Sequence, residues 1–146
     1  MTRCIPHFIL LCLLSSCSSA FHREWKAAVK AGPTSNVEGA WEGTWASASN
    51  GHQGKLRCVV GPAKNAQGDH AFHYHATWMR ILSGAYRADH RVVSSRKGES
   101  TFTGKHEMPK WAGGLYTYSG TTVGDSFSAC YECAIDKGSY QMQRVK

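Results

Sequence analysis

Histidine and cysteine are the residue types of this chain with the most versatile chemistry, and the chain has eight of one and six of the other. Imidazoles and thiolates bind metal ions, and they also transfer protons or attack electrophiles. His73 and His75 are two residues apart, so on a strand both rings lie on one face, a spacing found in some metal sites. That face is otherwise polar and offers no obvious third ligand. We therefore interpret the pair as exposed strand residues and predict no metal site.

Two other histidines, His90 and His106, fall among apolar residues in consecutive expected strands. A three-residue loop at 97–99 would place the two rings directly opposite each other. A buried polar pair needs hydrogen-bond partners, and the hydroxyls of Tyr116 and Tyr118 are candidates. The four side chains then form either a satisfied polar network in the core or rim, or a ligand or metal contact at one barrel mouth. We take them as candidate ligand-binding residues.

Three cysteines lie in the region expected to fold, and Cys130 and Cys133 have the C-x-x-C spacing of redox and metal sites. On a strand, residues three apart point to opposite faces, whereas redox pairs begin a helix that lowers the thiol pKa. A redox role is therefore not favoured. Cys58 and Cys133 share the apolar face, and export favours oxidation. We predict a Cys58–Cys133 disulfide across the interior, with Cys130 free.

Signatures of catalysis are missing from the sequence. The ten acidic residues show no pairing at hydrolase spacing, and no serine stands in a nucleophile elbow. The glycines mark turns and form no phosphate-binding loop. We predict no catalytic residue and no cofactor, and an enzyme is not the favoured class.

The amino-terminal residues have the pattern of a secretory leader. Arg3 precedes an apolar run at 8–14 that is too short to span a bilayer. The sequence Leu-Ser-Ser-Cys at 14–17 resembles the bacterial lipobox, in which the cysteine thiol receives a diacylglyceryl group as a thioether. This resemblance implies a signal peptide at 1–16 and lipidation of Cys17. Ordinary signal peptidase cleavage after Ala20 is the alternative, and both interpretations export the protein.

A lipidated Cys17 implies a lipid-anchored protein of the cell envelope. Ser18 follows it where aspartate would signal retention in the inner membrane, so the resemblance implies the outer membrane, with the domain facing the periplasm or the exterior. We interpret 17–38 as the lipidated cysteine and a tether. Within it, 21–31 can form a short amphipathic helix that the Gly-Pro-Thr-Ser-Asn sequence at 32–36 would end.

Residues 39–146 alternate apolar and polar between regularly spaced turn signals, which is typical of β-strands. Short connections predict antiparallel pairing of neighbours. Eight such strands would leave two unpaired edges unless the sheet closes. We therefore predict an all-β fold with one eight-stranded, antiparallel, up-and-down β-barrel. The expected strands are 41–48, 55–60, 70–78, 85–93, 101–107, 115–123, 127–135 and 140–145.

The alternation separates a polar face from an apolar, mostly aromatic one. A membrane barrel would turn the aromatic face to lipid, but most of these strands are shorter than the ~9–11 residues that a spanning strand needs. We therefore expect a soluble barrel that the aromatic face nearly fills, with little room for a large ligand. The apolar face comprises Trp41, Trp45, Leu56, Cys58, Val60, Phe72, Tyr74, Trp78, Tyr86, Phe102, Tyr116, Tyr118, Phe127, Tyr131, Ile135, Tyr140 and Met142.

The start and end of the expected barrel resemble the lipocalin-like barrels, or calycins. Gly39 and Trp41 match their Gly-x-Trp signature, and Arg144 stands where the family has an arginine near the last strand. The resemblance implies that Trp41 closes one end, that Arg144 packs over it through a cation–π contact, and that the barrel binds a small apolar ligand.

A second resemblance, to small exported bacterial lipoproteins, covers most of 39–144 and implies no activity. Its motifs are Trp-x-Gly-x-Trp at 41–45, Asn-Gly-His at 50–52, His-Ala-Thr at 75–77, Gly-Gly-x-Tyr at 113–116 and Asp-x-Gly-x-Tyr at 136–140.

The formal net charge of +7 is compatible with anionic partners. The basic residues are scattered, which argues against a nucleic-acid binder and leaves anionic lipid or an anionic envelope polymer. Two functions remain open. One is a lipid-anchored barrel that binds a small hydrophobic or aromatic ligand at its mouth. The other is a structural, envelope-interacting lipoprotein with a filled barrel and no ligand.

Overall fold

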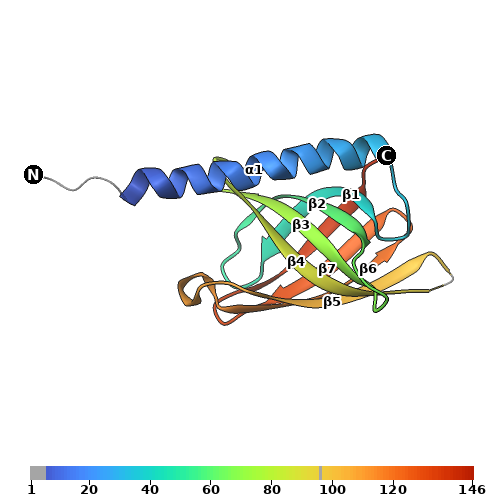
Figure 1. The fold of residues 1–146 in the computed structure, drawn as a ribbon. Helices are drawn as coiled ribbons and strands as arrows, with labels where there is room; N and C mark the ends of the chain where they lie inside the picture. The colour runs from blue at the N-terminus through green and yellow to red at the C-terminus, as the bar shows by residue number, and fades with distance from the viewer. Residues whose placement is uncertain (1–5, 96) are drawn as a thin grey trace, which may run out of the picture.

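A computed structural model describes residues 6–95 and 97–146, with side chains described from Ser18 onward except residue 96. The chain forms a helix followed by eight strands that close into one antiparallel barrel in sequence order, which confirms the predicted fold (Figure 1). The elements are α1 (Pro6–Ala31), β1 (Gly39–Ser47), β2 (Gln53–Ala63), β3 (Asp69–Trp78), β4 (Leu82–Ser94), β5 (Glu99–Glu107), the 3-10 turn η1 (Lys110–Ala112), β6 (Leu115–Val123), β7 (Ser126–Glu132) and β8 (Lys137–Arg144).

Closure depends on β1, which pairs with β2 on one side and with β8 on the other. Because neighbouring strands are antiparallel, their connections alternate between the two ends of the barrel. We call the end with the β1–β2, β3–β4, β5–β6 and β7–β8 connections the mouth end. The other end, where β1 begins and β8 finishes, we call the closed end.

The aromatic face points into the barrel, as its burial shows. Trp41, Phe72 and Phe127 are fully buried, and they pack together with the other apolar side chains in one core. Two members of the predicted apolar face are exceptions: Trp78 is 37% exposed and Ile135 is 63% exposed. Trp78 is the last residue of β3, and Ile135 lies in the turn between β7 and β8, where strand alternation no longer sets the direction of a side chain.

Arg144 and Trp41 form the centre of the closed end. The Arg144 guanidinium lies 4.1 Å from the centroid of the Trp41 ring. It also donates hydrogen bonds to the backbone carbonyls of Ser35, Asn36 and Glu38, at 2.7–3.2 Å. The arrangement that the calycin resemblance implies for these two side chains is thus the arrangement observed.

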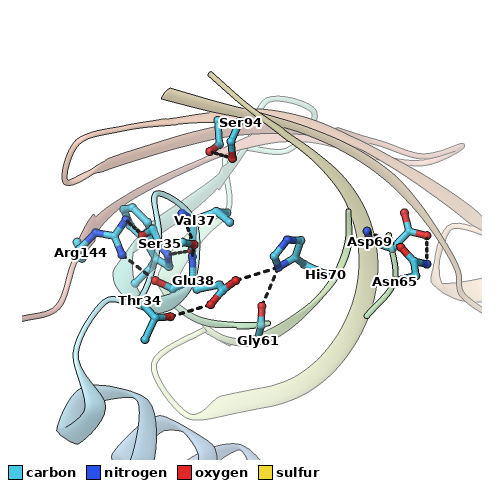
Figure 2. A network of polar contacts seen from close by, with 12 residues as sticks. Thr34, Ser35, Val37, Glu38, Gly61, Asn65, Asp69, His70, Ser94 and Arg144 are labelled. Carbon is cyan, nitrogen blue, oxygen red and sulfur yellow. Dashed lines mark hydrogen bonds and ion pairs between the residues drawn. The ribbon is translucent and has the colours of Figure 1, made fainter. Parts of the chain in front are cut away.

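Residues 33–38 form a plug that seals the closed end (Figure 2). Val37 is buried, and its carbonyl accepts a hydrogen bond from Trp41 Nε1 at 2.9 Å. Glu38 lies between Thr34, which donates to its carboxylate at 2.7 Å, and the ring of His70 at 3.9 Å. Gly39 then enters β1 with φ of +119°, a conformation that a side chain would strain, which explains the glycine of the Gly-x-Trp motif.

Helix α1 packs along the outside of β1 to β4 (Figure 1), so 21–31 contact the barrel, and the tether assigned to 17–38 stays a prediction. Phe21 is fully buried, and its ring stacks on His75 with centroids 5.0 Å apart. The expected 21–31 helix is the last part of this longer one. Arg57 of β2 also contacts the helix, because its guanidinium lies 4.8 Å from the centroid of the Trp25 ring.

The predicted leader, its cleavage and the lipid on Cys17 concern residues whose side chains lie outside the described ones, and they stay predictions. Within the described residues, no helix is both long enough and apolar enough to cross a membrane.

Replacing Arg144 with alanine is expected to lower the free energy of unfolding by about 2–4 kcal/mol, because it removes one cation–π contact and three charge-assisted hydrogen bonds from a buried position. Urea unfolding measures the change. Lys146→Ala is the matched control, since this exposed lysine only pairs with Asp125. Equal stability of the two variants would contradict the closing role of Arg144.

Replacing Phe21 with alanine is expected to detach α1 while the barrel stays folded, because Phe21 is the fully buried side chain of the helix. Amide hydrogen exchange of the full chain should then accelerate over 21–31 and stay slow in the strands. The exposed Lys26→Ala provides the control. Unchanged protection of α1 in the Phe21 variant would show that other contacts hold the helix.

Candidate functional site: a tyrosine-lined pocket at the barrel mouth

All six tyrosines of the chain point into the barrel and form a ladder toward the mouth end. The register explains why they meet. Tyr74 pairs with Tyr86 across β3 and β4, and Tyr118 pairs with Tyr131 across β6 and β7. Neighbouring rings lie 5.2–6.4 Å apart, close to the spacing that offset aromatic pairs prefer. The ladder joins the core to the open end.

Above this ladder lies a pocket of about 200 Å³ that opens at the mouth end. The hydroxyls of Tyr86 and Tyr140 meet at 2.8 Å within it. The full lining comprises Trp45, Leu56, Ala76, Tyr86, His106, Met108, Tyr116, Tyr131, Asp136 and Tyr140.

Polar groups around the pocket are held by internal hydrogen bonds. Asp136 accepts from Ser47 Oγ at 2.6 Å and from Tyr131 at 2.9 Å. Tyr116 donates to the Ala112 carbonyl at 3.0 Å. Such bonds fix the side chains in place, so the pocket presents ring faces with a few oriented polar atoms.

Burial keeps the tyrosine ladder neutral. It raises the pKa of Tyr118 to about 12, and it raises the pKa values of Tyr74, Tyr86 and Tyr140 well above their usual range. A phenol that stays protonated at neutral pH donates and accepts hydrogen bonds but does not act as a base or nucleophile. The four hydroxyls are therefore neutral hydrogen-bonding groups at neutral pH.

The structure separates the four predicted ligand-binding residues into two levels. His106 and Tyr116 line the pocket. Tyr118 is buried below them, and His90 is fully buried deeper in the core, with Nε2 3.1 Å from the Tyr74 hydroxyl.

The expectation that His90 and His106 face each other directly is wrong. Ser94 pairs with Ser100, so five residues separate these partners instead of the expected three, and the register is displaced by two residues. His90 therefore pairs with Gly104, while His106 pairs with Tyr116 on the next strand.

Gly104 leaves the space that His90 occupies. A Cβ at this position would lie 1.9 Å from Nδ1 of His90. Among the described residues Nδ1 has no hydrogen-bond partner, and burial lowers the pKa of His90 to about 4. His90 is thus a neutral core residue beneath the pocket.

Several pocket residues were not among the sequence candidates, notably Asp136 and Met108. Trp45, Tyr86, Tyr131 and Tyr140 were assigned to the apolar face but not to the site. The signal that could have found them is position: each stands in or next to the part of a strand that lies near the mouth end.

His73 and His75 are 4% and 9% exposed beneath α1, so the prediction that they are solvated strand residues is wrong. His73 Nδ1 lies 2.8 Å from the Glu24 carboxylate, which also pairs with Arg87. Burial lowers the pKa of His75, whose Nε2 has no hydrogen-bond partner in the described part of the chain. The described residues contain no group of three or more His, Cys, Asp or Glu arranged to hold a metal ion.

The predicted Cys58–Cys133 disulfide is absent from the structure, where Cys58, Cys130 and Cys133 are free thiols. Cys58 is buried in the middle of β2, where it pairs with Tyr74, and burial raises its pKa well above the usual range. Cys133 lies just beyond the end of β7. A shared face does not bring two residues to the same level of a barrel, and a disulfide needs Cα atoms within about 7 Å.

Comparison with known proteins adds no family, because no family model matches the chain and no curated protein matches it significantly. The geometry of the site therefore carries the functional argument. That geometry consists of one sealed end, a core filled by aromatic side chains, and a small pocket at the other end.

Protonation of His90 predicts a pH-dependent stability. The imidazole has a pKa of about 4 in the folded barrel and about 6.5 in an unfolded chain, so the unfolded state binds more protons between these pH values. Stability from this group is therefore present above pH ~6.5 and lost as pH falls toward ~4, by up to about 3 kcal/mol.

The variant His90→Gln should flatten this pH dependence, although it also lowers stability at neutral pH. Urea unfolding at a series of pH values measures the slope, and the exposed His52→Gln serves as control. A slope in His90→Gln equal to that of the wild type would show that other groups cause the loss.

Proposed function

We propose that this protein is an exported, lipid-anchored, lipocalin-like barrel that binds a small hydrophobic or aromatic molecule in the tyrosine-lined pocket. The observation that carries the proposal is the pocket itself, an aromatic recess open at the mouth end of a barrel whose other end is plugged. A purely structural core has no need of such an opening.

The size of the pocket limits the ligand. A cavity of about 150 Å³ holds a benzene molecule, whereas drug-sized ligands need roughly 300 Å³ or more. At about 200 Å³, the recess suits a molecule of one or two rings, or the end of an apolar chain. The faces of Tyr116 and Tyr131 would stack on a ring. Asp136 and His106 are placed to orient a hydroxyl or amino substituent.

The lipocalin-like assignment is supported by the packing of Arg144 over Trp41, in addition to the strand number. Export and lipidation are supported by the leader pattern and the Leu-Ser-Ser-Cys sequence. Together these features suggest a binding protein held at the envelope and facing the periplasm or exterior.

The alternative is a structural lipoprotein with no ligand, and the aromatic filling of the barrel below the pocket favours it. An anionic polymer partner receives less support, because basic side chains on β2, on β4 and in the connection after β2 are paired with acids. Arg57 pairs with Glu42, Lys64 with Asp89, and Arg91 with Asp69.

Ligand binding should depend on Ala76, which lines the pocket. Replacing it with leucine fills the recess and is expected to weaken binding of indole or p-cresol at least about tenfold, as measured by calorimetry. Ala46→Leu, on the exposed outer side of β1, is the matched control.

Native mass spectrometry of the full chain recovered from an exporting host complements this test. A copurified mass that denaturation removes supports the binding function, and the covalent mass reports lipidation of Cys17 or cleavage after Ala20. A protein mass with no copurified ligand, together with equal binding of the probe by Ala76→Leu and Ala46→Leu, would favour the filled structural barrel.

A further inference from the structure

Exposed apolar side chains are concentrated at the mouth end. Seven of the nine large hydrophobic residues that are exposed in the described chain lie there, and only Val93 and Val123 lie at the closed end. Four of the seven belong to one hairpin, β3–β4, namely Trp78, Met79, Ile81 and Leu82. The folded barrel gains nothing from this exposure, which suggests a partner outside the chain.

The β3–β4 connection presents apolar residues where turns usually carry glycine or polar residues. Met79 is 71% exposed and Ile81 is 86% exposed. Met79 and Arg80 both have positive φ, at 52° and 64°, a backbone conformation that glycine or asparagine would adopt more easily, and both side chains are exposed.

Two other mouth connections carry the same kind of residue. Trp111, in η1, is 85% exposed, and Ile135, between β7 and β8, is 63% exposed. Basic side chains accompany them, since Arg80 stands beside Ile81 and Lys110 beside Trp111, and both are exposed. The exposed acids Glu107 and Glu132 end β5 and β7 at the same end of the barrel, where the exposed Lys137 begins β8. Tryptophan with lysine or arginine is typical of side chains at a membrane surface.

Helix α1 leads to the same end. It runs along β1 to β4, and its amino-terminal turns extend beyond the barrel on the mouth side (Figure 1). Cys17 precedes Phe21 by four residues on this helix, about 6 Å along its axis. Phe21 itself packs on His75, near the end of β3. A chain held by its amino-terminal part thus has its mouth directed to the surface that holds it.

We propose that the mouth end docks on a lipid bilayer, with the β3–β4 hairpin and Trp111 inserted among the headgroups and the pocket opening toward the lipid. The apolar side chains belong to three separate connections around the opening and to the first residue of β6. A fluid surface conforms to such separate segments, whereas a folded protein partner needs a contiguous complementary face. This docking does not depend on ligand binding in the pocket.

Quenching of tryptophan fluorescence by brominated lipids tests the proposal in the full chain, bound to vesicles of phosphatidylcholine and phosphatidylglycerol. Trp41 is fully buried, while Trp25 and Trp45 are half-buried and give a background that W78F/W111F retains, so the quenching that is lost in W78F/W111F reports on Trp78 and Trp111. We expect strong quenching of the wild type and loss of most of it in W78F/W111F.

Charged substitutions at the hairpin tip test the docking directly. In vesicle-bound protein, M79E/I81E should move the mouth end away from the bilayer and reduce quenching several-fold. The control V93E/V123E changes two exposed residues at the closed end and should leave quenching unchanged. Quenching that is equal in wild type and M79E/I81E would overturn the proposal.

A second copy of the chain is the competing occupant of the rim. A dimer in lipid-free solution that M79E/I81E dissociates, together with no quenching on vesicles, would assign the rim to that copy and overturn the lipid proposal. Because indole binding is measured without lipid, failure of docking and failure of the binding function remain distinguishable.

Discussion

The contact between the Arg144 guanidinium and the Trp41 ring is the interaction on which the architecture depends. It joins the first strand to the last, and three backbone carbonyls of the plug satisfy the charged group in a position sheltered from water. A buried guanidinium without such acceptors would destabilise the fold. By sealing one end, the contact leaves the opposite end as the place where the interior meets solvent and where any molecule can enter.

The interior then divides by depth. Near the closed end the phenyl rings of Phe72, Phe102 and Phe127 pack together, and the neutral His90 ring packs against Phe72 and Phe102. Toward the mouth the tyrosines replace them, and their hydroxyls bond to each other or to nearby carbonyl and carboxylate oxygens. This gradient forms a recess in the core without any change of fold. The tyrosines that line the recess still stack like core residues, whereas Tyr74 and Tyr118 stay buried beneath it. In the proposed binding function, recognition would come from ring faces and oriented neutral hydroxyls.

Strand alternation predicted the eight strands and their two faces, because a period of two is a local property of the chain. Closure followed from the need to pair both sheet edges, and the inward direction of the aromatic face followed from the length of the strands. It also identified Tyr116 and His106, which do line the recess. The position of α1 could not be derived in the same way, since the burial of His73 and His75 depends on a segment about fifty residues earlier. The pairing of His90 with Gly104 and the position of Cys133 along the barrel axis could not be predicted either. A change of two residues in one turn shifts every contact along a strand pair, but it does not alter which face a residue occupies.

The pairing of β1 with β8 also has a kinetic consequence. Trp41 and Arg144 are brought together across almost the entire barrel sequence, so closure is the contact of highest sequence separation in the sheet. Hairpins such as β3–β4 can form early, but the closing seam must wait for the last strand and for the loss of chain entropy that it entails. Until then β1 and β8 each present an unpaired edge that can join another chain. The pairing of β1 with β8 leaves the folded barrel without unpaired edges, but it makes folding slow. Aggregation through unpaired edges is therefore limited to the time before this pairing forms.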